Sequence, residues 1–132
     1  MSQENVEIVQ RGFQATLDQD WGNVFPTLDS KVEIHDFDVP DAGVYRGHEG
    51  FVAWLQRWNE GWDSWRIEDL DFRATGDDEA LATFRMIAKG KHSGLEIERD
   101  DALLYRVTDG KIVRMEYFND RELALEAAGL SS

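Results

Sequence analysis

Two aspartates occur where a β-strand would turn a carboxylate toward the protein interior. Asp36 shares the apolar parity of the run 31–37, and Asp101 shares that of the run 95–107. Burial among apolar groups raises the pKa of a carboxyl toward neutrality, where it can act as a general acid or base. The two residues are therefore candidates for acid–base chemistry.

Each aspartate also has a purely structural interpretation. Asp36 can cap backbone amides in a turn at the end of its strand. Asp101 can pair with Arg99, two residues away, or the strand can twist it to the rim of the sheet. From the residues alone, these interpretations stay open beside the chemical one.

Composition and charge exclude several classes of function. The 132 residues fit a single domain over 1–132, and the lack of cysteine excludes disulfides and is compatible with a reducing cytoplasm. The net charge of −13 disfavours nucleic acid and anionic membranes, and no apolar run is long enough to span a bilayer. Nothing resembles a nucleotide cradle, and His35, Asp36 and His48 lack a recognised metal-ligand spacing. We therefore expect no cofactor and no metal.

Local patterns order the helices and strands that would position these residues. An apolar stripe at helical spacing begins at Val6, and a second, mostly of tryptophans, begins at Phe51. Elsewhere the alternation of apolar and polar residues predicts strands. The alternation changes parity at Asp69, which predicts a β-bulge there. Asp120 is the predicted N-cap of the last helix. The predicted order is helix 2–20, helix 21–28, strand 31–37, loop 38–50, helix 51–62, strands 64–75, 80–90, 95–107 and 111–119, and helix 120–130. Helices segregated from an antiparallel sheet define an α+β domain.

The last two strands form a predicted hairpin around Asp109-Gly110. A three-residue loop, 108–110, would set Tyr105 opposite Val113 and Leu103 opposite Met115, which matches the apolar faces of the two strands. The predicted inward face is Leu95, Ile97, Arg99, Asp101, Leu103, Tyr105 and Val107, opposite Val113, Met115, Tyr117 and Asn119.

Four strings of the sequence, in this order, are similar to those of a known family. They are Val32–Phe37 (VEIHDF), Asp41–Gly50 (DAGVYRGHEG), Asp109–Arg114 (DGKIVR) and Tyr117–Glu122 (YFNDRE). With them the chain resembles the SnoaL-like branch of the nuclear transport factor 2-like superfamily. The resemblance implies a cone-shaped, strongly curved antiparallel sheet wrapped around N-terminal helices (a cystatin-like α+β roll), with a pocket at its wide end. It also implies a homodimer through the outer sheet face.

The resemblance leaves the reaction open, because one fold hosts many chemistries. Asp36 falls where ketosteroid isomerases carry their proton-shuttle carboxylate, but Phe13 and Leu103 occupy the positions of the two oxyanion donors. Tyr117 stands where an epoxide hydrolase would need an acid, which argues against that reaction. Polyketide cyclases need an acidic base for aldol closure, and here Asp36 or Asp101 would have to serve.

The first hypothesis is a proton-transfer enzyme that acts on a hydrophobic carbonyl compound, with Asp36 as the base. Tyr105, Tyr117 and Asn119 would polarise or orient the substrate, and large apolar side chains would form the walls. The candidate catalytic residues are Asp36, Asp101 and Tyr117; the candidate substrate-binding residues are Phe13, Trp54, Trp58, Trp65, Phe84, Met86, Leu103, Tyr105, Met115 and Asn119.

Two further hypotheses compete with catalysis. The missing oxyanion donors favour a non-catalytic binder that holds an apolar small molecule in the same pocket. Alternatively, the tryptophans fill the cone and the protein is a structural dimer without a site.

Overall fold

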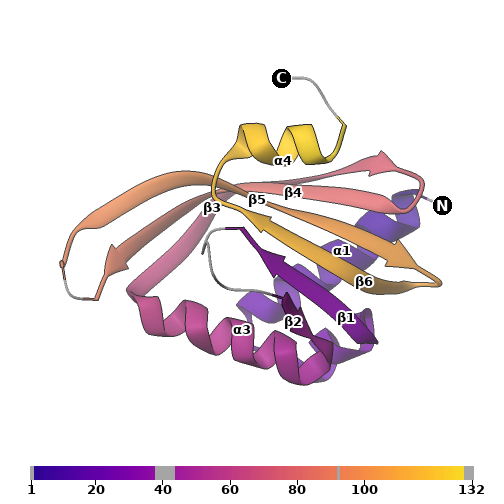
Figure 1. Ribbon diagram of the computed structural model, residues 1–132, viewed down its shortest axis with the longest axis horizontal. Helices are drawn as coiled ribbons and strands as arrows, with labels where there is room; N and C mark the ends of the chain where they lie inside the picture. Colours follow the sequence, from indigo (N-terminus) through magenta and orange to yellow (C-terminus); the bar gives the residue numbers. More distant parts are fainter. Residues whose placement is uncertain (1, 38–43, 92, 130–132) are drawn as a thin grey trace.

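A computed structural model of the protein describes residues 2–37, 44–91 and 93–129 (Figure 1). The predicted α+β class is confirmed. Three helices and two strands come first, followed by four long strands and a closing helix. The elements are α1 (Ser2–Leu17), α2 (Trp21–Val24), the 3-10 turn η1 (Phe25–Thr27), β1 (Leu28–Asp36), β2 (Val44–Arg46), α3 (Gly47–Gly61), β3 (Trp62–Gly76), β4 (Glu79–Gly90), β5 (Glu96–Thr108), β6 (Lys111–Phe118) and α4 (Arg121–Ala127).

The six strands form one curved, unclosed sheet in the order β2-β1-β6-β5-β4-β3. Helices α1 and α3 pack against one face, and α4 lies on the opposite face against β5 and β6 (Figure 1). The sheet was predicted to be antiparallel, but β1 and β6 run parallel. This pairing needs no hairpin, because α3 and the four strands β2, β3, β4 and β5 separate β1 from β6 along the chain.

The predicted bulge at Asp69 is confirmed and helps to bend the sheet. Its φ is 53°, and the β3–β4 register shifts between Glu68 and Asp71. A bulge adds one residue to one strand and increases the local twist. The two halves of β3 can therefore both turn apolar side chains toward the helices.

The predicted hairpin exists, but its predicted register is wrong. Thr108 pairs with Lys111, so the loop has two residues, and Asp109 and Gly110 both have positive φ, as a type I′ turn requires. An extra residue, Val113, then shifts the register, so that Tyr105 faces Met115. The shift from the predicted pairing is two residues, and therefore the parity of the inward face is kept.

Several predicted boundaries also change. Within the predicted loop 38–50, residues 38–43 lie outside the described part of the chain, and the rest forms β2 and the start of α3. Trp62 begins β3 instead of ending the helix. Leu95 and Ile97, predicted to face inward, are 68% and 36% exposed. They lie where β4 connects to β5, at the far end of the part of this hairpin around Ala88 to Ile97, which we call the β4–β5 arm.

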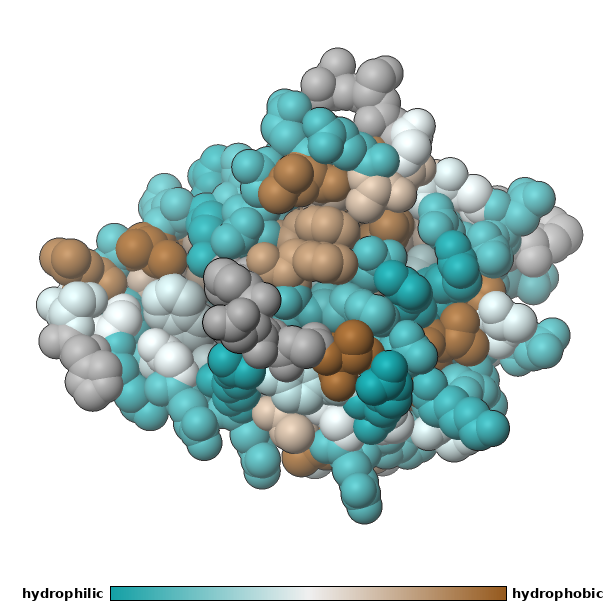
Figure 2. Space-filling model, viewed as in Figure 1, coloured by the Kyte–Doolittle hydropathy of each residue, from teal (hydrophilic) through white to brown (hydrophobic). Residues whose placement is uncertain are grey.

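The core lies between the helices and the concave face of the sheet, and a smaller apolar cluster lies under α4. Figure 2 shows a largely hydrophilic surface that is interrupted by a hydrophobic patch beside α4. Phe37, which is 52% exposed, stacks on Phe118 of the smaller cluster, and Leu123 on α4 is 50% exposed. The outer face of the sheet is thus partly covered by α4 and partly apolar.

Asp120 caps α4 as predicted. Its carboxylate accepts hydrogen bonds from the backbone N–H groups of Glu122 (2.8 Å) and Leu123 (3.4 Å). Gly129 follows the helix with φ of 76°, a conformation that a glycine adopts without strain. The N-cap prediction is therefore confirmed.

Candidate functional site

An apolar cavity of about 70 Å³ lies between the helices and the concave face of the sheet. By the same kind of measure a single water molecule needs roughly 10–15 Å³, so this space holds several waters or a small organic group. Among residues 2–37, 44–91 and 93–129, none of the lining side chains carries a charge. They are Gly12, Phe13, Thr16, Leu17, Val24, Thr27, Leu28, Phe51, Trp54, Leu55, Trp58, Trp65, Ile67, Phe84, Leu103, Tyr105, Ile112, Met115 and Tyr117.

Most of the predicted substrate-binding residues meet at this cavity. Helix α1 contributes Phe13, α3 contributes two indoles, and β3 to β6 contribute the remainder. Those that line it are Phe13, Trp54, Trp58, Trp65, Phe84, Leu103, Tyr105 and Met115, together with the predicted catalytic residue Tyr117. Met86 is fully buried in β4 but does not line the cavity, and Asn119, just past β6, does not line it either.

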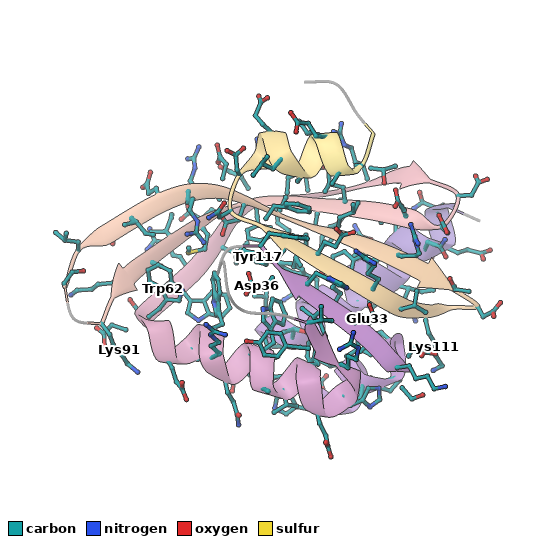
Figure 3. The ribbon with its side chains drawn as sticks, viewed as in Figure 1. Glu33, Asp36, Trp62, Lys91, Lys111 and Tyr117 are labelled. Carbon is teal, nitrogen blue, oxygen red and sulfur yellow. The ribbon has the colours of Figure 1, made fainter. Side chains whose placement is uncertain are left out.

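Neither predicted carboxylate is part of the lining. Asp36 is 9% exposed at the end of β1, where it accepts a hydrogen bond from Nε1 of Trp54 at 2.8 Å. It is also the register partner of Tyr117 on β6, and Figure 3 shows the two side by side in the space between the sheet and α3. Asp36 therefore stands next to the cavity wall, in contact with one of its indoles.

Asp101 is completely buried and forms an ion pair with Arg99. Nε of Arg99 donates to Oδ1 at 2.7 Å and Nη2 donates to Oδ2 at 2.9 Å, the two-pronged geometry of a strong guanidinium–carboxylate pair. The Tyr117 hydroxyl donates a short hydrogen bond to Oδ2. The structural interpretation of Asp101 as a partner of Arg99 is confirmed, and the carboxylate also accepts a hydrogen bond from the cavity residue Tyr117.

Tyr105 has a different environment from Tyr117. Its side chain is 3% exposed, and its hydroxyl has no hydrogen-bond partner among residues 2–37, 44–91 and 93–129. Burial raises the pKa of this hydroxyl far above its ordinary value, so it stays protonated. The cavity therefore has one buried phenol whose donor is not used within the described part of the chain.

The tryptophan edge of α3 is both core and cavity wall. The Trp58 ring lies 5.1 Å from that of Tyr117 and 6.2 Å from that of Trp65, in tilted and edge-to-face arrangements. Trp54 packs 6.1 Å from the Tyr117 ring. The predicted alternative, in which the indoles fill the cone completely, does not hold, because the rings leave the cavity between them.

A larger outer basin of about 560 Å³ adjoins the cavity. The two spaces share Thr16, Leu17, Leu55, Trp65 and Ile67, and the basin adds polar groups such as Asn59, whose amide oxygen accepts from Nε1 of Trp65 at 2.9 Å. The inner cavity and the outer basin are therefore neighbours that share one part of their lining.

Sequence analysis missed several lining residues. Thr16 and Thr27 are polar, but their hydroxyls donate to backbone oxygens of Gly12 (2.7 Å) and Val24 (2.6 Å). The position of Thr16 on the apolar edge of α1, next to Leu17, is a signal in the sequence. For Thr27, in a 3-10 turn, no local pattern indicates the cavity.

The histidines considered as metal ligands have other partners. His35 contacts Oε1 of Glu33 at 3.0 Å, and His48 contacts the backbone oxygen of Leu28 at 3.1 Å. Over the described ranges, no group of three His, Cys, Asp or Glu side chains is placed to hold a metal ion. No helix in those ranges is long and apolar enough to cross a membrane.

The fold and the cavity together define a class: an α+β roll of the nuclear transport factor 2-like type with a cavity between helices and sheet. Residues 9–115 match the SnoaL-like domain, so the chain belongs to the SnoaL-like domain family. A search of curated proteins finds no match.

Solved structures agree with this assignment. The chain is similar to a nuclear transport factor 2-like protein of Burkholderia xenovorans (26% identity, 97% of each chain covered, TM-score 0.78). It is similar to another from Burkholderia thailandensis (27% identity, 93% of this chain and 95% of that chain, TM-score 0.77). A protein of Xanthomonas campestris, proposed to be a polyketide cyclase, shares the fold (18% identity, 96% and 98% covered, TM-score 0.74).

Proposed function

We propose that this protein binds a small apolar molecule in the inner cavity, with Tyr105 and Tyr117 as its polar contacts. The observation that carries the proposal is the buried Tyr105 hydroxyl, which lies on a lining residue and has no partner in the described chain. A bound ligand can accept a hydrogen bond from this hydroxyl. Apolar pockets with a few polar groups are typical small-molecule sites.

Filling the cavity tests this proposal. Leu103→Phe adds volume inside the cavity, whereas Leu104→Phe makes the same change on the opposite face of β5, under α4. We expect p-xylene, detected by NMR titration, to bind the wild type and Leu104→Phe but to bind Leu103→Phe about tenfold more weakly. Equal binding by all three proteins would contradict the assignment of the cavity as the binding site.

A second function, proton transfer with Asp36 as the base, is favoured by the Trp54–Asp36 hydrogen bond. This contact links a buried carboxylate to a residue of the cavity wall, and Asp36 also pairs with Tyr117 across the strands. The substrate would be a hydrophobic carbonyl compound whose α-proton moves to the carboxylate. Aldol closure and isomerisation both begin with such a step.

Exchange of α-protons with solvent measures this step without knowledge of the natural substrate. We expect the protein to accelerate deuterium exchange into the acetyl group of 4-methylacetophenone in D₂O. Asp36→Asn should reduce the acceleration by about 10²-fold or more, whereas Asp71→Asn, at an exposed position on β3, should not. If the wild type gives no acceleration, or if Asp36→Asn keeps it, Asp36 is not a base for this class of compound.

We also propose, from the family resemblance, a homodimer through the outer sheet face. The exposed Phe37 and Leu123 beside α4 support this surface as part of the interface. Sedimentation at micromolar concentration should give a dimer that Leu123→Glu weakens, while Leu95→Glu, at the far end of the β4–β5 arm, should not. A monomeric wild type would contradict the proposal. A cytoplasmic location remains a prediction.

A further inference from the structure

We propose that the inner cavity and the outer basin hold the two ends of one amphiphilic molecule, with an apolar end in the cavity and an uncharged, hydroxyl-rich head, such as a sugar, in the basin. This inference rests on the proposed binding function, because it makes the apolar molecule of that function one end of a larger ligand. The sizes of the two spaces, their common boundary and the side chains of the basin carry it.

The inner cavity is too small for a whole ligand of ordinary size. An engineered cavity of about 150 Å³ in another protein holds one benzene molecule. The cavity here measures about 70 Å³ and is not fully enclosed, and the basin beside it measures about 560 Å³. A ligand whose apolar end fills the cavity therefore extends out of it, and the basin is an adjoining space with room for the remainder.

Each of three elements brings apolar side chains to the boundary between the two spaces. Helix α1 contributes Leu17, and α3 contributes Leu55. Strand β3 contributes Trp65 and Ile67, and all four side chains line both spaces. Nε1 of Trp65 donates to the amide oxygen of Asn59 on α3 at 2.9 Å, which ties this indole to the helix. The boundary therefore suits the apolar chain of an amphiphile that crosses it.

The basin presents both hydrogen-bond donors and hydrogen-bond acceptors. The polar side chains in its lining are Thr16, Gln19, Asn59, Asp63, Ser64 and Arg66. The Asp63 carboxylate is an acceptor without a hydrogen-bond partner in the described chain. Nε of Arg66 donates to Glu68 at 3.1 Å, and the guanidinium has further N–H donors. Because a hydroxyl both donates and accepts, a head with several hydroxyls pairs with both kinds of group, whereas an anion meets Asp63 and a cation meets Arg66.

Indoles supply flat apolar surface in the same basin. Trp21, Trp62 and Trp65 line it, and Trp21 is 41% exposed. Figure 3 shows Trp62 where α3 meets β3, and its ring lies 6.0 Å from that of Trp58 in the cavity wall. A sugar ring has a face of C–H groups that packs on an aromatic ring while its hydroxyls point to the side. Aromatic surface next to mixed polar groups therefore favours a sugar-like head.

Four ligands with the same hexyl chain and different heads test the inference. They are hexyl β-D-glucopyranoside, 1-hexanol, hexyl sulfate and hexyltrimethylammonium, titrated by NMR into the wild type and four variants. Asp63→Ala removes an acceptor from the basin, and its control Asp71→Ala makes the same change at an exposed position of β3 outside both linings. Leu103→Phe fills the cavity, and its control Leu104→Phe lies on the opposite face of β5.

For the wild type we expect the glucoside to bind about tenfold more tightly than 1-hexanol, and neither charged head to improve on the alcohol. Asp63→Ala should weaken binding of the glucoside about 3–10-fold and leave that of 1-hexanol unchanged. Leu103→Phe should weaken binding of both ligands about tenfold. The two controls should match the wild type.

The outcomes separate this ligand chemistry from the binding function on which it rests. If 1-hexanol binds but the glucoside has no advantage, if a charged head binds best, or if Asp63→Ala and Asp71→Ala behave alike, the proposed head is wrong and the binding function stands. If Leu103→Phe binds the glucoside as well as Leu104→Phe does, no apolar end enters the cavity and the two-ended ligand is wrong. If neither p-xylene nor any hexyl ligand binds the wild type, both proposals are wrong.

Discussion

At the scale of single residues, two tyrosines on neighbouring strands have opposite roles in hydrogen bonding. The Tyr117 hydroxyl donates a hydrogen bond to Asp101, whereas the Tyr105 hydroxyl has no acceptor in the described chain. The sequence marks both as inward residues by parity alone. It does not distinguish them, because the Asp101 carboxylate reaches one phenol and not the other only in the folded sheet.

The buried Tyr105 hydroxyl should make stability depend on alkaline pH. Burial raises the pKa of this hydroxyl in the folded protein. The contribution of the hydroxyl to the free energy of unfolding is therefore complete below the unfolded pKa of about 10, and it is lost as the pH rises above that value. The folded state keeps the proton that the unfolded state releases. The free energy of unfolding of Tyr105→Phe should therefore rise, relative to that of the wild type, by about 1.4 kcal/mol per pH unit above roughly pH 10. Urea unfolding measures this difference. A constant difference between the two proteins from pH 8 to pH 11 would contradict this.

The Arg99–Asp101 pair should be far more important to stability than the surface ion pairs. Asp101 is fully buried, so Arg99→Leu leaves a buried charge without its guanidinium and should cost about 3–5 kcal/mol in the free energy of unfolding. The matched control is Arg66→Leu, which removes an exposed pair with Glu68 and should cost at most about 1 kcal/mol. Similar losses in the two variants would mean that Asp101 does not depend on Arg99.

At the scale of elements, two bulges decide which side chains reach the cavity. Val113 shifts the β5–β6 register so that Tyr117 faces Leu103, and Asp69 changes the parity of β3. The change of parity at Asp69 is visible in the sequence as a break in alternation. No such break reveals Val113, because apolar residues occupy 112, 113 and 115. The predicted register is wrong for that reason.

The closing helix α4 should depend on its cap. Asp120→Ala removes the acceptor for two backbone N–H groups and should lower the free energy of unfolding by about 1 kcal/mol. Glu126→Ala, at an exposed position near the other end of α4, serves as the control and should have little effect. Both are measured by denaturant unfolding, and an equal effect of the two changes would exclude a capping role for Asp120.

At the scale of the whole molecule, the charge of −13 opposes folding through repulsion between like charges. Surface pairs such as Arg85–Asp69 (3.7 Å) and Arg106–Asp78 (3.8 Å) compensate weakly, since exposed pairs contribute only about 0–1 kcal/mol each. Salt screens both the repulsion between like charges and the attraction within the surface ion pairs. We expect the repulsion to be the larger of the two. Raising NaCl from low concentration to about 0.5 M should increase the melting temperature by about 4 °C, or roughly 1 kcal/mol. A decrease in the melting temperature would show that the surface pairs dominate.

Local sequence patterns are enough to predict the order of the helices and most strands, the inward parity of Asp101, Leu103, Tyr105 and Tyr117, and the family. These features depend on local periods of 2 and 3.6 residues and on short strings, which neighbouring residues specify. The three-dimensional structure alone decided that Asp36 and Asp101 stand behind the cavity wall, that Trp54 and Tyr117 stand between them and the cavity, and that the Tyr105 hydroxyl has no partner in the described chain. These depend on contacts between residues far apart in sequence, where a single inserted residue such as Val113 shifts every later pair.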